Sequence, residues 1–328
     1  NPDILFDEKI LQKGAEIVKE VNKEMAAIIG INPAARTTCV KPSGNASVLL
    51  QTASGIHAEH SNMYIRNVQM NKESEITQAI MKTNPYMVED SVWSAGGTDV
   101  VVSFPILPKK GSMYKDDLLG VKHLELVKKA QKHWVEAGTN EDLCADKGVR
   151  HNVSNTIIVD NWEEVEKYVF ENRHSFAGIS FLAMTGDKDY NQAPNTAVIT
   201  AKDMVKKYGN AAVFASGMVV DALKCFNNLW DACSTAKGFG EDLSLESSEN
   251  AMKRDWIRRF GKFADNYLKS DTLLAEHCLK DAYLLHKWNK IQSTLKTVDW
   301  KEDIKERKYT DVDTLAAAAC AGGACEID

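Results

Sequence analysis

Residues 37–47, Thr-Thr-Cys-Val-Lys-Pro-Ser-Gly-Asn-Ala-Ser, combine residue types that could bind an anion. The β-branched residues favour a strand, the proline and glycine end it, and a helix can begin immediately afterwards. The first N–H groups of a helix have no intrahelical acceptor and lie at the positive end of its dipole, so phosphate fits there. Ser43 and Ser47 add hydroxyl donors, and Lys41 adds a cation. The alternative is an ordinary turn in which Ser43 or Asn45 is the helix N-cap.

Two further cysteines, Cys320 and Cys325, lie close to the C-terminus and are separated by Ala-Gly-Gly-Ala. The two glycines relax the intervening turn, so the two sulfur atoms can form an intramolecular disulfide. A structural zinc site usually has four ligands, and no second cysteine pair lies nearby. Because residues 309–328 have little to bury, we predict a flexible tail whose dithiol takes part in thiol–disulfide exchange. The alternative is an incidental cysteine pair in a disordered tail.

His57 and His60 follow the predicted anion loop and could be metal ligands or acids, although a structural histidine is the more ordinary interpretation. No third ligand occurs at a spacing typical of a metal site, so we predict no bound metal. The other five cysteines lack a partner at a comparable spacing. We predict buried or unreactive thiols at these positions, which are Cys39, Cys144, Cys225, Cys233 and Cys278.

The composition is typical of a folded globular protein, with 44% hydrophobic and 26% charged residues among 328. A net charge of -6 argues against a protein that binds a nucleic acid polymer, although a local phosphate site remains compatible with it. No apolar run approaches the roughly 20 residues of a membrane span, so we predict no membrane partner. Seven cysteines without dense spacing favour a reducing, cytoplasmic location. The chain begins Asn-Pro-Asp, without an initiator methionine or a signal peptide, and we expect that residue 1 is not the native gene start.

Helical and strand patterns alternate before residue 201. Apolar residues at helical spacing predict a long amphipathic helix over 6–29, ended by Gly30. The near-continuous apolar run at 98–106 is typical of a strand covered on both faces, as in a parallel sheet. This alternation predicts an α/β fold with a mostly parallel sheet or barrel, followed by a mainly helical region with an aromatic core. The remaining predicted elements are helices over 72–82, 118–137, 162–171, 255–267 and 273–291, and strands over 153–159 and 178–184.

Several blocks of the sequence together resemble one protein family, the adenosylcobalamin-dependent (class II) ribonucleotide reductases. The blocks are Val-Lys-Pro-Ser-Gly at 40–44, Gly-Ile-His at 55–57, Tyr-Ile-Arg at 64–66, Arg-Asp-Trp-Ile-Arg-Arg-Phe at 254–260, Cys-Leu-Lys-Asp-Ala-Tyr-Leu-Leu-His-Lys-Trp at 278–288, and the terminal cysteine pair. The resemblance implies an α/β chain that forms the second half of a ten-stranded α/β barrel. It places that half-barrel at 1–200, a mainly helical region at 201–308 and a flexible redox tail at 309–328.

The resemblance also implies roles for particular residues. Phosphates of a ribonucleotide would be held by Ser43, Gly44, Asn45, Ala46 and Ser47, and the active-site disulfide would be re-reduced by Cys320 and Cys325. The implied cofactor is adenosylcobalamin. The implied partners are the ribonucleotide substrate, an N-terminal half of the reductase, and a thioredoxin-type or glutaredoxin-type reductant.

Two departures from the family pattern narrow this hypothesis. Asn45 stands where the family usually has threonine. More importantly, the family's radical-bearing cysteine lies upstream of the phosphate loop, and residues 1–36 contain no cysteine. We therefore predict a C-terminal part of a reductase that is inactive alone. The alternative is a noncatalytic nucleotide-binding or regulatory subunit. A freestanding thiol oxidoreductase is disfavoured, because no Cys-x-x-Cys lies beside a strand–helix–strand pattern.

Overall fold

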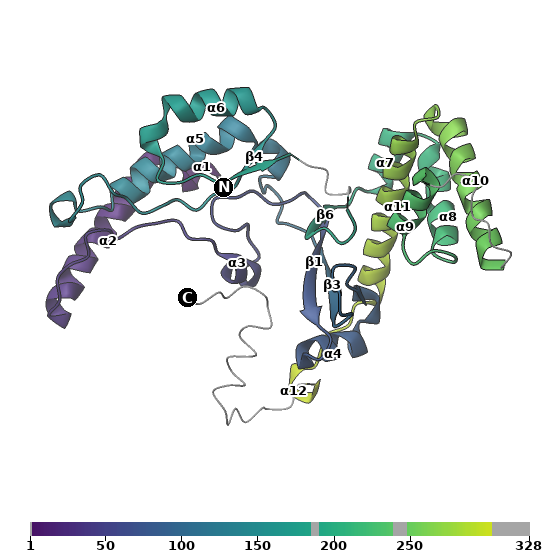
Figure 1. Ribbon diagram of the computed structural model, residues 1–328. Coiled ribbons are helices and arrows are strands. Elements are labelled where there is room, and N and C mark those ends of the chain that lie inside the picture. The colour runs from purple at the N-terminus through teal and green to yellow at the C-terminus, as the bar shows by residue number, and fades with distance from the viewer. Residues whose placement is uncertain (1, 185–189, 239–247, 304–328) are drawn as a thin grey trace. The chain divides into compact units, whose positions relative to one another are not determined.

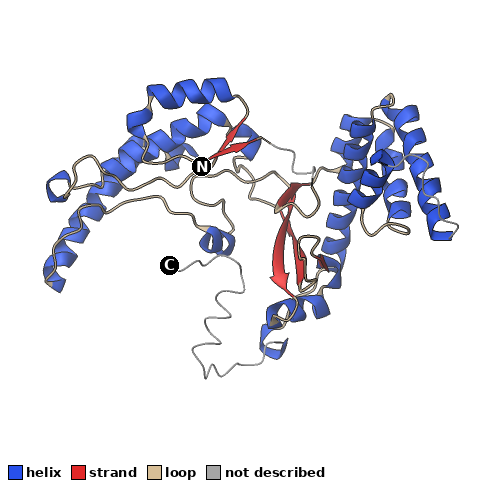
Figure 2. Cartoon of the chain, viewed as in Figure 1, coloured by secondary structure: helices blue, strands red, loops and turns tan. Residues whose placement is uncertain are grey.

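The computed structural model describes residues 2–184, 190–238 and 248–303. The chain divides into two compact units that interleave in sequence (Figure 1). The first unit comprises residues 1–62 and 107–186, and the second comprises residues 63–106 and 187–328. Helices make up most of the regular structure in both units (Figure 2).

The first unit is mainly helical, with one short parallel sheet. Its helices are α1 (Pro2–Leu5), α2 (Glu8–Ile29), α3 (Gly44–Leu50), α5 (Gly120–Ala130), which continues as a π-helix (Gln131–Glu136), and α6 (Trp162–Glu171). Three 3₁₀ turns lie at Lys115–Asp117, Glu141–Leu143 and Arg173–Ser175. Strands β4 (Ile157–Val159) and β5 (Phe181–Ala183) form the parallel pair.

The ends of α2 follow directly from the sequence. Asp7 is the N-cap, and its carboxylate accepts a hydrogen bond from Ile10 N at 2.9 Å. Gly30 is the C-cap with a φ of 79°, a left-handed conformation that glycine adopts without strain. The core of this unit lies between α5 and β4, and its most deeply buried side chains are Leu124, Val127, Val135, Val153 and Ile157.

The second unit combines an antiparallel sheet with a helical bundle. The sheet has the order β2 (Val88–Asp90), β3 (Asp99–Ile106), β1 (Tyr64–Asn71), β6 (Asn195–Ala197), and every neighbouring pair is antiparallel. Helix α4 (Glu75–Thr83) and a 3₁₀ turn (Pro85–Met87) connect β1 to β2. The bundle contains α7 (Ala201–Tyr208), α8 (Ala211–Ala222), α9 (Leu229–Gly238), α10 (Ser248–Leu268) and α11 (Thr272–Thr294), and the short α12 (Trp300–Asp303) follows.

Helix α11 is the centre of this bundle and contacts α7, α8, α9 and α10. Most of the aromatic side chains predicted to form a core are buried there, which are Trp256, Phe260, Phe263, Tyr283 and Trp288, but Tyr267 is 38% exposed. Trp256 is fully buried, and its indole Nε1 donates to Met218 O at 2.9 Å. Tyr208 donates its hydroxyl to the buried Asp281 carboxylate at 2.6 Å. Burial and that carboxylate raise the pKa of Tyr208 far above its ordinary value.

The mixed α/β composition and most predicted helices are confirmed, but the predicted sheet is wrong in part. The run at 98–106 forms β3, which is antiparallel to both of its neighbours. Residues 100–103 are buried one after another, so both faces of the strand are covered, and an apolar run predicts burial without predicting strand direction. The parallel prediction is confirmed for β4 and β5 alone among the described strands. These strands do not form a barrel, and the strand expected before residue 41 is reduced to isolated bridges from Arg36 to Thr139 and from Val40 to Val153.

The predicted division at residues 200 and 308 remains a prediction, since the two compact units interleave along the chain and the tail lies outside the described residues. Within the described part of the chain, no helix has both the length and the apolar character needed to cross a bilayer.

Candidate functional site

The predicted anion loop lies between an anchored extended segment and the first turn of α3. Val40 is fixed on both sides, because its N–H donates to Asn152 O at 3.4 Å and its carbonyl accepts from Ser154 N at 2.9 Å. Ser43 is the N-cap residue of α3, as one alternative proposed, but its side chain makes no capping hydrogen bond. The loop therefore starts from a fixed position at Val40, and the Ser43 hydroxyl does not cap the helix.

Both predicted hydroxyl donors make hydrogen bonds within the loop region. Ser43 Oγ accepts from Gly55 N at 2.9 Å, and Ser54 Oγ accepts from Ser43 N at 3.2 Å. Ser47 is buried, and its hydroxyl donates to Gly44 O at 3.0 Å. The Ser47 hydroxyl proton is therefore used within α3, whereas Ser43 Oγ acts as an acceptor towards Gly55 and can still donate its own proton.

Two glycines shape the space around this loop. Gly55 has a φ of 57°, and a Cβ placed on it would lie 3.4 Å from the carbonyl oxygen of Lys41, so the two loop segments approach closely there. Gly44 is exposed, and a Cβ placed on it would meet no atom within 4 Å. The backbone at the start of α3 is accordingly open to an approaching group.

His57 is a structural histidine in this arrangement. Its Nδ1 lies 2.9 Å from Ser54 O, which can only accept, so Nδ1 carries the proton. Its Nε2 then accepts from Thr156 N at 3.0 Å. Both ring nitrogens are therefore occupied by backbone groups, and neither is available to a metal or a substrate.

The neighbouring His123 is also held as a neutral ring. It lies edge-on to His57 with ring centroids 5.7 Å apart, and its Nε2 lies 3.0 Å from Ile56 O. Burial lowers the pKa of His123 to about 4, with a smaller contribution from His57. Sequence spacing pointed to His57 and His60 and gave no signal for His123, which reaches the site from α5.

Asn155 is the buried polar residue beside these histidines. Its side-chain nitrogen donates to Val153 O at 2.7 Å and to Gly178 O at 3.0 Å, and so links the segments that lead into β4 and β5. Among the residues that the structure describes, no donor reaches Asn155 Oδ1. Its position is tied to the loop, because the neighbouring Ser154 N donates to Val40 O.

A pocket of about 380 Å³ lies next to the 55–59 segment of the first unit. One part of its wall is apolar and includes Phe6 and Leu118, and another part carries the exposed Lys109 and Lys110. The two lysines favour an anion, although Glu59 also lines the pocket, and no local sequence pattern indicated them. The predicted phosphate residues 43–47 do not line it.

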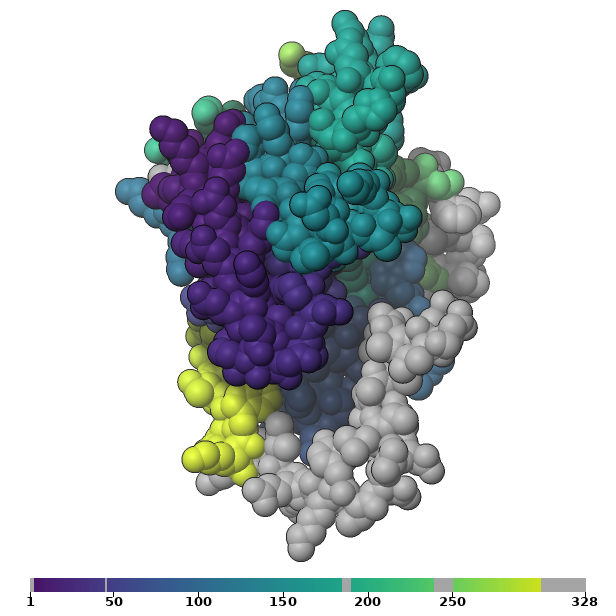
Figure 3. Space-filling view, turned by 90° about the vertical axis from the view of Figure 1, so that its left-hand side faces the viewer, coloured from purple at the N-terminus to yellow at the C-terminus, as the bar shows by residue number. Residues whose placement is uncertain are grey.

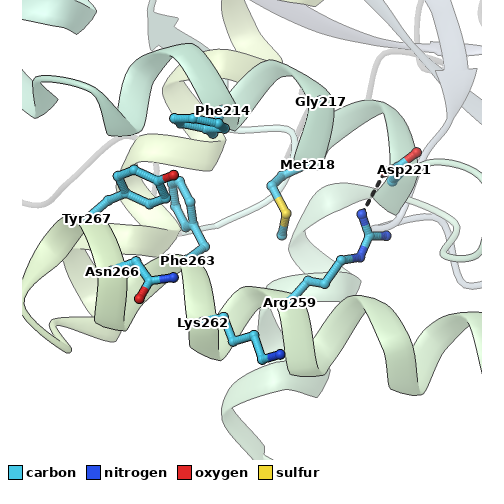
Figure 4. Close-up of a pocket in the computed structure, with 9 residues that line it drawn as sticks. All are labelled: Phe214, Gly217, Met218, Asp221, Arg259, Lys262, Phe263, Asn266 and Tyr267. Carbon is cyan, nitrogen blue, oxygen red and sulfur yellow. Dashed lines mark hydrogen bonds and ion pairs between the residues drawn. The ribbon is translucent and has the colours of Figure 1, made fainter.

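A second pocket, of about 320 Å³, lies between α8 and α10 of the helical bundle (Figure 4). Phe214 and Tyr267 stack at its edge with ring centroids 4.7 Å apart. Arg259 donates from Nη1 to Asp221 at 2.8 Å, and its Nε lies 3.0 Å from the Asp255 carboxylate as an ion pair. Hydrogen bonds from Arg259 and Lys224 lower the pKa of Asp221. Arg259 and these two carboxylates are thus mutually paired.

The described cysteines divide into one exposed thiol and four buried ones. Cys144, Cys225, Cys233 and Cys278 are buried as predicted, whereas Cys39 is exposed, so for Cys39 only the prediction of an unreactive thiol remains. Burial raises the pKa of Cys233 and of Cys278 to about 12, which keeps both thiols protonated and unreactive. Cys320 and Cys325 lie outside the described residues.

Comparison with known proteins confirms the family resemblance predicted from the sequence. The chain is 28% identical over 123 residues to a Dictyostelium discoideum protein named as a probable adenosylcobalamin-dependent ribonucleoside-triphosphate reductase, a match that covers 38% of this chain and 16% of the relative. It is 24% identical over 191 residues to the adenosylcobalamin-dependent ribonucleoside-triphosphate reductase of Euglena gracilis, covering 57% of this chain and 24% of the relative. The chain thus spans a quarter or less of these curated relatives.

One solved structure, a B12-dependent (class II) ribonucleotide reductase, aligns with a TM-score of 0.48 and 18% sequence identity. That alignment covers 60% of this chain and 26% of the solved chain. No protein-family model matches the chain.

Proposed function

We propose that this chain is the C-terminal part of an adenosylcobalamin-dependent ribonucleotide reductase, which converts ribonucleotides to deoxyribonucleotides. The observation that carries the proposal is the similarity to the Euglena gracilis reductase, because it extends over 57% of the chain. The chain would bind the substrate's phosphates and supply the external reductant arm. The radical-bearing cysteine and the rest of the catalytic groups would come from the N-terminal half.

In this proposal the first unit contributes strands to a ten-stranded barrel that the N-terminal half completes. Support comes from β4 and β5, a parallel pair in which Phe181 and Leu182 of β5 are 40% and 54% exposed. Parallel sheets are normally covered on both faces, and two strands alone are marginally stable. Leu49 of α3, beside the loop, is 84% exposed as well. These apolar side chains are the ones that further strands and helices would cover.

The phosphates would bind at the start of α3, at residues 43–47. The open backbone around Gly44 favours contacts through the N–H groups of the first helical turn. The internal bonds of Ser43 and Ser47 give their hydroxyls a positioning role, since they hold the loop against Gly55 and close its first turn. Lys41 precedes this turn and supplies a positive charge.

Cys320 and Cys325 would transfer electrons between the reductase and an external thioredoxin-type or glutaredoxin-type protein. One tail thiolate attacks the active-site disulfide, and the second thiol resolves the mixed disulfide. The active-site pair is thereby reduced, and the tail pair becomes the disulfide that the external dithiol reduces. The buried Cys233 and Cys278 are unsuited to this exchange, because burial keeps them protonated.

Adenosylcobalamin, when bound, would supply the radical chemistry of such an enzyme. Three pockets of the described residues do not fit it. Their volumes of about 320, 380 and 490 Å³ lie in the lower half of the range of roughly 300–1,000 Å³ typical for drug-sized ligands, and this cofactor is larger than such ligands. We therefore assign no cobalamin contact and no step through the cofactor to this chain.

The direct test is to mix the chain with an N-terminal half, adenosylcobalamin, ribonucleoside triphosphates and a dithiol. Formation of deoxyribonucleotide that requires both halves is expected, and its absence with a folded pair contradicts the proposal.

Gly44→Val then tests the phosphate loop. Its side chain points into open space, so the fold is retained while the backbone is shielded, and KM should rise at least about tenfold. Gly217→Val, also in open space, is the control.

A noncatalytic nucleotide-binding or regulatory subunit is the second candidate, and the open backbone at the start of α3 favours it, because that backbone could bind phosphate without any catalytic group. Titration of labelled ribonucleotide against the isolated chain separates the two. Strong binding without a partner supports the subunit, whereas binding that appears only with the N-terminal half supports the partial enzyme.

A further inference from the structure

Helix α2 has two distinct apolar faces, and its own unit covers one of them. The covered face includes Ala15 and Ala26, which are 0% and 4% exposed, and it packs against the π-helix that follows α5. On that side Gln12 Nε2 lies 2.9 Å from His133 Nδ1. A Cβ placed on Gly14 would lie 3.2 Å from the Trp134 ring.

The second face is a straight stripe of four β-branched residues exposed to solvent. Ile10, Ile17, Val21 and Ile28 are 54%, 47%, 50% and 77% exposed. At about 100° per residue these positions lie within about 20° of one line along the helix, and the line is about 27 Å long. Figure 3 shows the purple N-terminal residues, which include α2, on the face turned towards the viewer. A continuous apolar stripe on a surface marks an interaction site.

The charges on α2 exclude a membrane surface as the occupant of this outer stripe. Interfacial helices are rich in lysine and arginine on their polar face. Helix α2 carries equal numbers of acidic and basic side chains, which are Glu8, Glu16, Glu20, Glu24, Lys9, Lys13, Lys19 and Lys23. A helix of balanced charge with an apolar line at a spacing near 3.5 residues fits another helix.

We propose that the outer stripe packs against α2 of a second copy of this chain, with the two helices antiparallel. The spacing of the stripe is symmetric, because positions 10 and 28, like positions 17 and 21, lie at equal distances on either side of residue 19. An antiparallel pair centred at that level places Ile10 opposite Ile28 of the second copy and Ile17 opposite Val21. A two-fold axis generates such a self-matching contact.

The flanking charges match in the same register. Gly14 and Glu24 are also equidistant from residue 19, so Glu24 of the second copy lies opposite Gly14, at the edge where the Trp134 ring covers that glycine. Lys13, beside Gly14, then lies next to that carboxylate. The two-fold symmetry forms this Lys13–Glu24 pair twice. In a parallel arrangement Lys13 would instead lie beside Lys13 of the second copy, and the like charges disfavour that arrangement.

This dimer goes beyond the proposed function and does not depend on it, since it needs neither nucleotide nor cobalamin.

The test is the mass of the full 328-residue chain by light scattering and sedimentation equilibrium. We expect twice the 36.4 kDa of one chain. Ile17→Asp and Val21→Asp should each raise the dissociation constant at least about 30-fold, because both lie at the centre of the contact. Val213→Asp, at a residue 68% exposed on α8, should leave it unchanged.

A charge exchange tests the register. Lys13→Glu alone and Glu24→Lys alone should each weaken the dimer, and the double variant should recover the original dissociation constant. Circular dichroism of each variant establishes that the exposed substitution leaves the fold intact. A chain of monomeric mass overturns the proposal and assigns the stripe to a segment of a longer polypeptide. A dimer unaffected by Ile17→Asp, or a double variant without recovery, overturns it as well.

Discussion

His123 makes the stability of the first unit depend on pH. Its ring is 3% exposed and is neutral, and burial lowers its pKa from 6.5 to about 4. In the unfolded chain the same ring takes up a proton as the pH falls below about 6.5, whereas in the folded chain it does so only near pH 4. The unfolded state therefore binds more protons in this window, and stability rises with pH there.

We predict that the first unit loses about 3 kcal/mol of stability through His123 as the pH falls from 6.5 to 4, with no further loss through this residue below pH 4. Amide hydrogen exchange of peptides from α5, corrected for the intrinsic pH dependence of exchange, measures the change. His123→Gln should flatten this part of the profile. His174→Gln, at an exposed histidine, should leave it unchanged. An unaltered profile in the His123 variant contradicts the assignment.

At the level of single residues, the sequence predicted where the candidate loop lies but not how its side chains are used. Ser43 and Ser47 looked like phosphate donors because their types and spacing fit. In the structure Ser43 Oγ accepts from Gly55 N and the Ser47 hydroxyl donates to Gly44 O, and the first contact joins residues twelve positions apart. His57 likewise gains its second partner from Thr156, ninety-nine positions away. Such long-range partners leave no signal in a local pattern.

At the level of elements, the segment that leads into the loop is held in place by a glycine. Thr38 donates its hydroxyl to Trp134 O at 2.6 Å, and Thr37 N donates to Gly138 O at 3.0 Å. A Cβ placed on Gly138 would overlap Thr38 Oγ1 and lie 2.6 Å from Thr38 Cγ2. The extended segment can lie against the end of the π-helix only because residue 138 has no side chain.

Gly138→Ala should therefore destabilise the first unit by about 1–3 kcal/mol, since the added methyl displaces Thr38 from its hydrogen bond. Gly217→Ala is the matched substitution in the middle of α8, where a Cβ meets nothing within 4 Å. There the same change should stabilise by up to about 1 kcal/mol, because alanine favours a helix. Urea unfolding, combined with hydrogen exchange of each unit, measures the change in stability of both variants. Equal changes for Gly138→Ala and Gly217→Ala would contradict this account.

Elements with strong periodicity and clear caps were predicted well. The structure reproduces α6 at the predicted bounds and places α2 between Asp7 and Gly30, because capping and apolar spacing are local properties. The sheet was predicted less well. Strand β3 is covered on both faces inside an antiparallel sheet, and its sequence carries no information about the direction of its neighbours.

At the level of the whole molecule, this chain is similar to only part of a reductase. The similarity to reductases covers 38% and 57% of the chain but only 16% and 24% of the relatives. In the proposed function, a chain of this extent supplies part of a catalytic unit. If that unit is a reductase, each turnover oxidises two active-site thiols, and an external dithiol must reach them. The tail pair, Cys320 and Cys325, is then the link to that external dithiol. Its loss should stop re-reduction of the active-site thiols while it leaves the reaction at the substrate intact.

We predict that Cys320→Ser and Cys325→Ser each reduce thioredoxin-driven turnover of the reconstituted enzyme at least about 100-fold, because a single tail thiol can form a mixed disulfide but cannot resolve it. Turnover with a small dithiol, which reaches the active-site disulfide directly, should be retained. Cys39→Ser removes an exposed thiol that has no assigned part in this relay and should leave both activities unchanged. If the tail variants lose both activities together, the cysteines act in the chemistry itself. If they lose neither, the dithiol is incidental, while the assignment of the remaining chain to a reductase still rests on the requirement for both halves.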